Sequence, residues 1–353
     1  MKSQSSLLPL LFAAAAPTAS QAQSIYEIAS DSDDFTTLTA AIDAAGLAET
    51  LSEDGPFTVF APTDGAFDDI PRRTLERLLR PQWIFHLQDL LLYHALDSVV
   101  TSADLEDGLE VETINAEDIV INLDDDGASI TTVSDTTSNI LVEEELVDIE
   151  ADNGIIHVVD SVLLPTSATQ NIVDIAVGNE DFSILVEAVV AAGLVDALSG
   201  EGPLTVFAPT NEAFQDLPSG TLDRLLRPQN RDELVSLLLY HVVPGNVHSS
   251  VLSLGRGHVT TLNGEDIHVR VPKRSNRAIK INRSKVIAEN ILASNGIIHV
   301  IDEVLIPPPE KSSKSTKKST KKKTNTKGYG WWGTSGKSSK SAKSSKSSGK
   351  SRK

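Results

Sequence analysis

The sequence predicts an α+β protein with two homologous domains in tandem, and three observations lead to this fold class. The stretch from Gly193 to Thr210 repeats the stretch from Gly46 to Thr63. In each copy, apolar residues at helical spacing come first and strand-like patterns come later, the order of an α+β fold. The repeat is much longer than a solenoid unit of roughly 20–50 residues, so each copy is expected to be a whole domain with its own core.

Four segments follow from the changes in composition along the chain. We expect a signal peptide at residues 1–22, a first domain at 23–165, a second domain at 166–308 and a disordered basic tail at 309–353. The tail consists almost entirely of Lys, Ser, Thr and Gly, which cannot bury enough apolar surface to offset the entropy lost on ordering.

The first residues have the pattern of a secretory signal. Lys2 is followed by an apolar run from Leu7 to Ala16 and by Ser20-Gln21-Ala22, a suitable cleavage site. The run is too short to span a bilayer, and no other run of about 18 apolar residues exists. We therefore expect a secreted protein of the extracellular matrix or cell wall, without a membrane span. The alternative is an N-terminus that is hydrophobic and simply disordered.

Each copy opens with two helices. A capping residue with an acid three positions later marks the first helix, at Ser24–Glu27 and again at Asn171–Asp174. Apolar residues then recur at three-and-four spacing, and Gly46 and Gly193 end the second helix of each copy.

A short strand and two more helices follow. Residues 58–60 and 205–207 have the composition of buried strands, and a proline stops each one. A short helix then ends at another proline, and an amphipathic helix runs over about 83–94 and 231–241 with leucines on its inner face.

The second half of each copy changes to strand periodicity. Residues 119–123, 130–133 and 267–271 favour strands, and Asn153-Gly154 and Asn295-Gly296 are tight-turn signals that precede a further strand. The second copy is five residues shorter in this half, and we expect the missing residues in loops.

Three motifs resemble the fasciclin domain, and each occurs in both copies. In the first copy they are Thr58–Thr63, Tyr93-His94 and Asn153–Asp160, and the resemblance covers nearly all of residues 24–308. It implies a wedge-shaped β-sandwich of about seven strands with packed helices in each copy. It also implies a secreted adhesion or extracellular-matrix protein that binds surface proteins or glycans without catalysis.

The resemblance also suggests binding residues. In some animal members of the family the Tyr-His region is linked to integrin binding, which by position implies Tyr93, His94, Tyr240 and His241. The alternative is a structural role, because a Tyr-His pair at a helix end often satisfies buried backbone groups.

Two other histidines, one asparagine and the end of the tail also support expectations. His157 and His299 lie among alternating apolar residues and are predicted to be core histidines. The one sequon predicts a glycan on Asn282 near a surface loop. The tail has no hydrophobic end segment, so a lipid anchor is not expected.

The sequence excludes several kinds of chemistry. With no cysteine, thiol catalysis, thiolate zinc sites and disulfides are absent. No hydrolase, metalloprotease, EF-hand or Rossmann motif occurs in the folded part. Residues 333–338 resemble the end of a phosphate-binding loop, but Trp331 stands where that motif requires its first glycine. We expect no cofactor, no metal site and no enzyme. The acidic runs 124–126 and 143–145 are either a solvated face or a weak calcium site.

The net charge of −18 hides a strong asymmetry. Residues 24–165 carry 4 basic and 32 acidic side chains (−28), residues 166–310 carry 11 and 17 (−6), and residues 311–353 carry 15 and none (+15). The tail resembles the lysine-clustered segments of diatom silica-associated proteins and is expected to contact an anionic polysaccharide or silica. The lysines expected to make this contact are Lys314, Lys317, Lys318, Lys340, Lys343 and Lys346.

The sequence leaves alternatives open for the tail and for the function of the whole protein. Nucleic acid would suit the tail electrostatically but is not expected as a partner of a secreted protein, and the tail would also serve as a solubilising spacer. For the whole protein, the alternatives to adhesion are a hydrolytic enzyme with His94 or His241 as base, and a silica-templating protein with the domains as scaffold.

Overall fold

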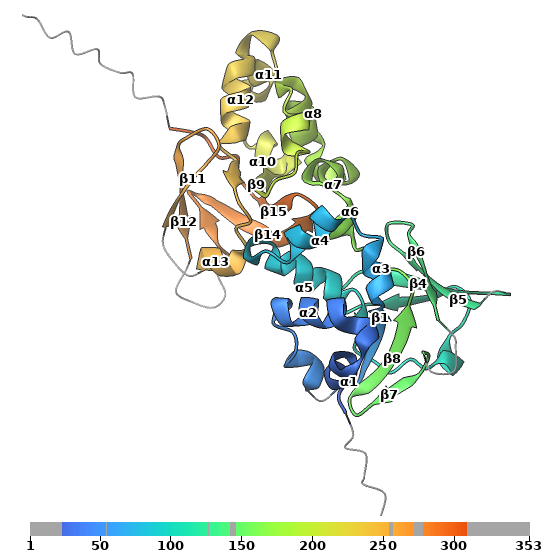
Figure 1. The fold of residues 1–353 in the computed structure, drawn as a ribbon. Coiled ribbons are helices and arrows are strands. Elements are labelled where there is room, and N and C mark those ends of the chain that lie inside the picture. The colour runs from blue at the N-terminus through green and yellow to red at the C-terminus, as the bar shows by residue number, and fades with distance from the viewer. Residues whose placement is uncertain are drawn as a thin grey trace, which may run out of the picture. The chain divides into compact units, whose positions relative to one another are not determined.

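The computed structural model describes residues 23–53, 55–125, 127–141, 146–253, 257–271 and 278–308. The expected signal peptide, the basic tail with its six named lysines, Asp126 and the run 143–145 lie outside the described residues. The described residues all belong to one compact unit that ends at Pro308. Within it, the two copies recognised in the sequence have the same order of elements, as the predicted tandem of α+β domains requires (Figure 1).

The first repeat begins with helices and ends with strands. Its helices are α1 Ile25–Asp31, α2 Thr36–Ala45, α3 Asp64–Asp68, α4 Arg72–Leu78, α5 Ile84–Leu92 and the linking α6 Thr166–Thr169. Its strands are β1 Phe57–Pro62, β2 Ala95–Leu96, β3 Leu109–Glu112, β4 Asp118–Asp124, β5 Gly127–Thr132, β6 Thr137–Ile140, β7 Ile149–Ala151 and β8 Gly154–Val159. They form one sheet in the order β2-β1-β8-β6-β5-β4-β3, and β7 also pairs with β8.

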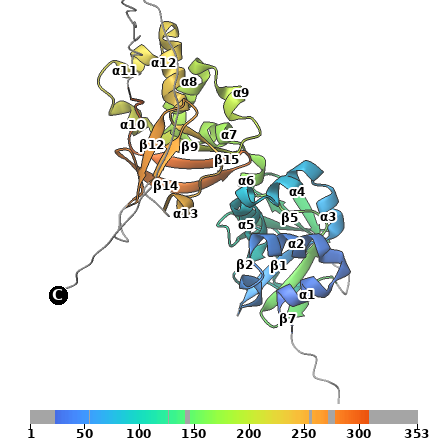
Figure 2. The same cartoon turned by 60° about the vertical axis from the view of Figure 1, so that its left-hand side comes forward.

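The second repeat follows the same plan. Its helices are α7 Ile172–Gly178, α8 Ser183–Ala192, α9 Val195–Leu198, α10 Asn211–Gln215, α11 Thr221–Leu225, α12 Arg231–Leu239 and α13 Ser249–Ser253. Its strands are β9 Leu204–Pro209, β10 Val242–Pro244, β11 Gly257–Thr260, β12 Asp266–Arg270, β13 Lys280–Ile281, β14 Ser284–Ala293 and β15 Gly296–Ile301, in the order β10-β9-β15-β14-β13-β12-β11. Helices α8 and α12 pack side by side (Figure 2).

Short 3-10 helices join several of these elements. They are η1 Asp33–Phe35, η2 Thr50–Ser52, η3 Pro81–Trp83, η4 Ser102–Asp104, η5 Glu180–Phe182 and η6 Pro228–Asn230. Proline begins both η3 and η6, because its missing N–H and its fixed φ suit the first helical position.

The helix ends match the sequence signals. Ser24 and Asn171 both form a capping box with the acid three residues later, which pairs donors that the first helical turn leaves free. Gly46 and Gly193 end α2 and α8 in the left-handed conformation, at φ +69° and +66°. A side chain disfavours this conformation, so glycine is the suitable residue there.

Each repeat has two cores, one on either side of its central strands. In β1, Val59 and Ala61 face the core under the helices, whereas Phe60 faces a second core enclosed by the outer strands. Figure 1 shows α2 and α5 on one side of β1 and the β4–β5 hairpin on the other. The second repeat divides its core in the same way, and all four cores consist of residues between Ile25 and Leu305.

The length difference between the repeats lies largely in one connection. In the first repeat, β6 and β7 pair with β8 as two separate strands, joined by a segment that contains residues 142–145. In the second repeat, the single strand β14 pairs with β15 along the whole corresponding length, with two register shifts. The second repeat thus has one continuous strand where the first has two.

Candidate functional site

The Tyr-His pair follows directly from the end of α5. Leu87, Leu90 and Leu91 of this helix are buried, so the residues that continue its path also enter the core. Tyr93 is 0 % exposed; its hydroxyl donates to the carbonyl of Asp118 and accepts from the backbone N–H of Val133, both at 3.1 Å. Burial raises the pKa of Tyr93 to about 12. The hydroxyl thus ties the helix end to two strands.

His94 is held by a hydrogen bond at each ring nitrogen. Nε2 accepts from the backbone N–H of Leu163 at 2.9 Å, which places the ring proton on Nδ1, and Nδ1 donates to the carbonyl of Leu90 at 2.8 Å. The side chain is buried, and desolvation lowers its pKa to about 4.

The second repeat reproduces this arrangement. The Tyr240 hydroxyl donates to the carbonyl of Asp266 at 3.0 Å. His241 donates through Nδ1 to the carbonyl of Leu237 and accepts at Nε2 from the N–H of Leu305, both at 2.8 Å. Burial lowers the pKa of His241 to about 4 as well.

These contacts bear on two of the functional hypotheses. Neither His94 nor His241 can act as a general base in this structure, because both nitrogens are bonded to backbone and the rings are 3 % and 2 % exposed. Partner binding in the region of the two Tyr-His pairs stays a prediction. In this structure it requires the surface around the pairs, since the four side chains themselves are buried.

A hollow of about 450 Å³ lies next to the Tyr-His pair of the first repeat. Its wall is mainly apolar, and His94 forms part of it. The other lining residues include Leu38, Ile42, Phe57, Leu91, Ile114, Asp97 and Glu112. Ile114 is 37 % exposed. The hollow combines residues from α2, β1, α5 and the segment after β3, and for this reason the sequence did not reveal it.

Asn282 occupies the turn between β13 and β14. Its backbone is left-handed, at φ +56°. The side-chain oxygen accepts from the N–H of His268 at 2.9 Å, and Nδ2 donates to the Tyr240 hydroxyl at 3.1 Å. A glycan on Nδ2 would compete with this second bond. Glycosylation of Asn282 stays a prediction.

The predicted core histidines are confirmed. His157 and His299 are both 0 % exposed and stack against Phe60 and Phe207. Nε2 of each ring is bonded to a backbone carbonyl, that of Val100 at 2.8 Å in the first repeat.

Sequence reasoning missed the role of the asparagine in each Asn-Gly turn. The Asn153 carboxamide accepts from the N–H of Ile25 at 2.9 Å and donates to the carbonyls of Leu51 and Glu53 at 2.8 and 2.9 Å. Asn295 makes the equivalent three bonds in the second repeat. Each asparagine therefore joins a β-turn to the first helix and to the loop before β1 or β9. The occurrence of asparagine at the same place in both copies was the available signal.

Neither a membrane-spanning helix nor a metal-binding cluster occurs among the described residues. No helix in the described ranges is long and apolar enough to cross a membrane. The same part of the chain has no group of three or more His, Asp or Glu side chains placed to hold a metal ion.

Each repeat is similar to a known protein family. The family model described as fasciclin domain matches residues 33–165 and 180–307. Protein sll1483 from Synechocystis is 50% identical over 143 residues, which cover 40% of this chain and 77% of that protein. Human periostin is 30% identical over 289 residues, or 82% of this chain and 32% of periostin.

Two further similarities involve both repeats. Pig transforming growth factor-beta-induced protein ig-h3 is 30% identical over 301 residues, 82% of this chain and 38% of that protein. This chain therefore spans only about a third of the length of its animal relatives. A solved domain pair from the insect cell adhesion molecule fasciclin I aligns with a TM-score of 0.44 at 19% identity, over 76% of this chain and 95% of that one. Because the family model matches both repeats over most of their length, the chain belongs to the fasciclin domain family.

Proposed function

We propose that the protein is a secreted, nonenzymatic adhesion or matrix protein that binds surface proteins or glycans through its two fasciclin domains. Fasciclin domains occur in secreted adhesion and matrix proteins such as ig-h3 and periostin. The observation that carries the proposal is the apolar hollow beside His94, which offers a partner a recess next to the Tyr-His pair. The buried, fully bonded histidines speak against the hydrolytic alternative.

Binding by the folded part can be tested at the mouth of the hollow. Ile114→Asp places a charge where an apolar group of the partner would bind, so we expect residues 23–308 carrying it to lose most of their binding to matrix from the producing cells. Ile287→Asp is the matched control, because Ile287 is 57 % exposed and lies on β14 of the second repeat. Equal binding by the two variants would remove the hollow from the proposal.

The tail supplies the second part of the proposal, as an anchor to an anionic wall, polysaccharide or silica. Its lysines recur about every third residue, which suits a diffuse polyanion better than a single pocket. Removing residues 311–353 should abolish retention on silica and on acidic polysaccharide at low salt, with no change in the Tm of the folded part. Unchanged retention would contradict the anchor. If the isolated tail peptide precipitated silica, the templating alternative would gain support.

Secretion is tested most directly on the native protein. Mass spectrometry of the mature protein from its matrix should find an N-terminus near residue 23. An intact N-terminus on a protein from the cytosol would contradict the proposal.

A further inference from the structure

The first repeat concentrates its positive charge in one place. Residues 24–165 include four basic side chains, all arginines, and all four lie in the nine residues from Arg72 to Arg80. The same repeat carries 32 acidic side chains. We call Arg72, Arg73, Arg77 and Arg80 the arginine segment. Such a distribution gives a strongly acidic domain one local positive surface.

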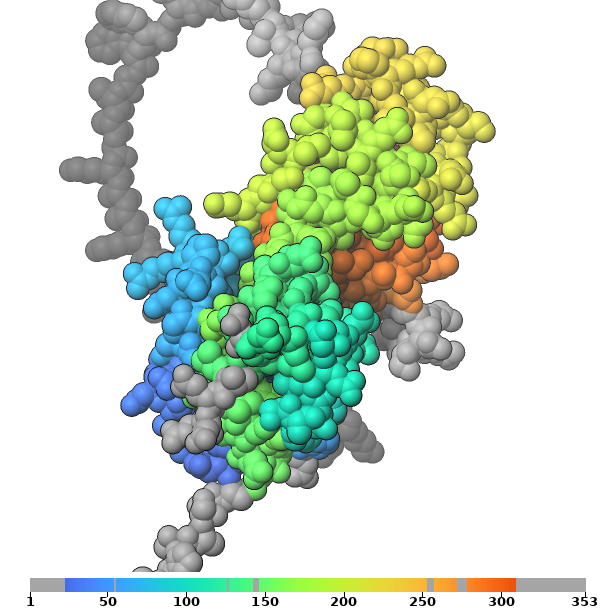
Figure 3. Space-filling model, turned by 90° about the vertical axis from the view of Figure 1, so that its right-hand side faces the viewer, coloured from blue at the N-terminus to red at the C-terminus, as the bar shows by residue number. Residues whose placement is uncertain are grey.

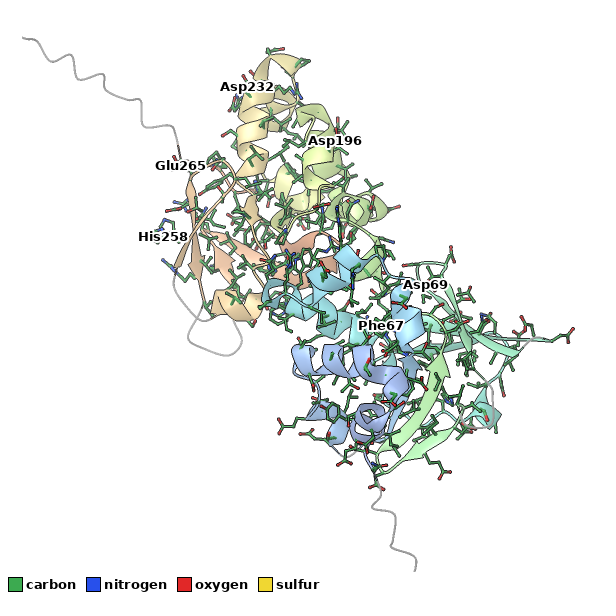
Figure 4. All side chains as sticks on the ribbon, in the orientation of Figure 1. Phe67, Asp69, Asp196, Asp232, His258 and Glu265 are labelled. Atoms are coloured by element: carbon green, nitrogen blue, oxygen red, sulfur yellow. The ribbon has the colours of Figure 1, made fainter. Side chains whose placement is uncertain are left out.

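Helix stability does not explain this placement. Arg72 and Arg73 open α4, where the helix dipole is positive and a cation is unfavourable. The corresponding positions of the second repeat are Ser219 and Gly220, so the fold itself does not require arginine there. Arg72, Arg73 and Arg80 are exposed. Figure 4 labels Phe67 and Asp69 at the end of α3, the helix before α4, and Figure 3 shows the light-blue part of the chain at the molecular surface.

Arg77 is held in place by an aromatic ring. Its guanidinium carbon lies 4.7 Å from the ring centre of Trp83, which is itself buried. The Nε atom of Arg77 is buried without a hydrogen-bond partner among the described residues. The guanidinium is therefore oriented in advance, and less side-chain entropy is lost when it binds an anion.

Arg77 lacks the acidic partner that the equivalent arginine of the second repeat has. Arg224 occupies the position of Arg77 and binds Glu233 with two hydrogen bonds of 2.5 and 2.7 Å. In the first repeat, His86 stands at the position of Glu233. No arginine of the segment lies within 4.0 Å of a carboxylate in the part of the chain that the structure describes, although Glu76 is on the same helix.

We propose that the arginine segment docks a short acidic peptide of a partner protein. This inference rests on the proposed adhesion function and names one partner class and its site. Guanidinium groups bind carboxylates through paired hydrogen bonds, so the chemistry of the surface matches Asp and Glu side chains. Leu79, which is 42 % exposed between Leu78 and Arg80, adds an apolar contact that a peptide side chain can use.

The dimensions of the surface favour a short ligand over a long polyanion. The seven residues of α4 extend about 10 Å, Arg80 follows two residues after the helix, and the Debye length at physiological ionic strength is about 8 Å. Two or three carboxylates therefore fit within the positive surface. A long polysaccharide would run beyond it and meet the acidic side chains that give this repeat its net charge of −28.

Direct binding measurements test the proposal. The probe is a short fluorescein-labelled peptide of glutamate and leucine, and the protein is residues 23–308, which contain all four cores and lack the lysines of the tail. Fluorescence anisotropy should show about tenfold weaker binding for Arg72→Gln/Arg73→Gln, since each exposed ion pair contributes modestly. The control is Arg227→Gln/Arg283→Gln, which removes the same charge from exposed positions of the second repeat and should bind like the unchanged protein.

Three results would overturn the inference. The first is no binding of the peptide, and the second is equal binding by the two double variants. The third is tighter binding of polygalacturonate or dextran sulfate than of the peptide, lost in the Arg72→Gln/Arg73→Gln variant, because it would make the surface a glycan site. Failure of matrix binding with intact peptide binding would instead count against the proposed function alone.

Discussion

The Tyr93-His94 pair and the Tyr240-His241 pair make equivalent hydrogen bonds in their two repeats. The tyrosine hydroxyls bind carbonyls about 25 residues further along the chain. The histidines accept from backbone N–H groups more than 60 residues away. Buried donors left without partners would be costly, so these side chains hold the last part of each repeat against its long helix.

The buried histidines predict a pH dependence of stability. Because the pKa of His94 and of His241 falls from 6.5 to about 4 on folding, the unfolded chain binds protons first as the pH drops. Their contribution is fully present above pH 6.5 and is lost progressively as the pH falls towards 4. Each histidine should remove about 2 kcal/mol from the free energy of unfolding between pH 7 and pH 5.

The measurement is urea denaturation at both pH values. His94→Gln should be less stable at pH 7 and should lose about 2 kcal/mol less than the unchanged protein on going to pH 5. His258→Gln serves as the control, since His258 is exposed on the outer side of β11 (Figure 4). An identical pH dependence in the His94 variant and the unchanged protein would contradict the role of this histidine.

At the scale of elements, the central feature of each repeat is a parallel strand pair. β1 pairs with β8 from Phe57↔Gly154 to Pro62↔Val159, and β9 pairs with β15 in the same register. The second strand of each pair begins at the glycine of the Asn-Gly turn. A Cβ on Gly154 would lie 2.0 Å from the carbonyl oxygen of Phe57, and one on Gly296 would lie 1.9 Å from that of Leu204. Only glycine lets these strands approach.

A pair of alanine substitutions tests this close approach. Gly154→Ala should destabilise the protein by about 3 kcal/mol, because backbone cannot yield to the added methyl as a flexible side chain would. Gly65→Ala is the control, since a Cβ there meets only the Thr63 hydroxyl at an ordinary 3.6 Å inside helix α3. This second change should be neutral or stabilising by up to about 1 kcal/mol. Chemical denaturation measures the free energy of unfolding of both variants. Equal changes in the two would contradict the close backbone approach as the reason for glycine at position 154.

At the scale of the whole molecule, two repeats of one fold carry very different charge. The first repeat has a net charge of −28 and the second −6, with separate cores. Repulsion within a compact domain grows steeply with its net charge and is screened by salt. The two repeats should therefore differ in how their stability responds to ionic strength.

Thermal unfolding of the separate repeats tests this difference. Residues 23–170 and 171–308 each contain the cores of one repeat, and we expect each to unfold cooperatively. Raising NaCl from about 10 to 150 mM, across which the Debye length falls from about 30 to 8 Å, should raise the Tm of the first repeat by several degrees and that of the second far less. Equal shifts in Tm would show that self-repulsion is not a major term in the first repeat.

The amino-acid sequence by itself determined the tandem repeat, the α+β order, the helix caps at Ser24 and Asn171 and the helix ends at Gly46 and Gly193. These features depend on residues a few positions apart, so local periodicity and capping chemistry reveal them. Only the tertiary structure decided the parallel pairing of β1 with β8, the burial of the Tyr-His pairs, the three bonds of Asn153 and the hollow beside His94. Each of these joins residues that lie tens of positions apart, and which distant groups meet is settled by packing of the whole core.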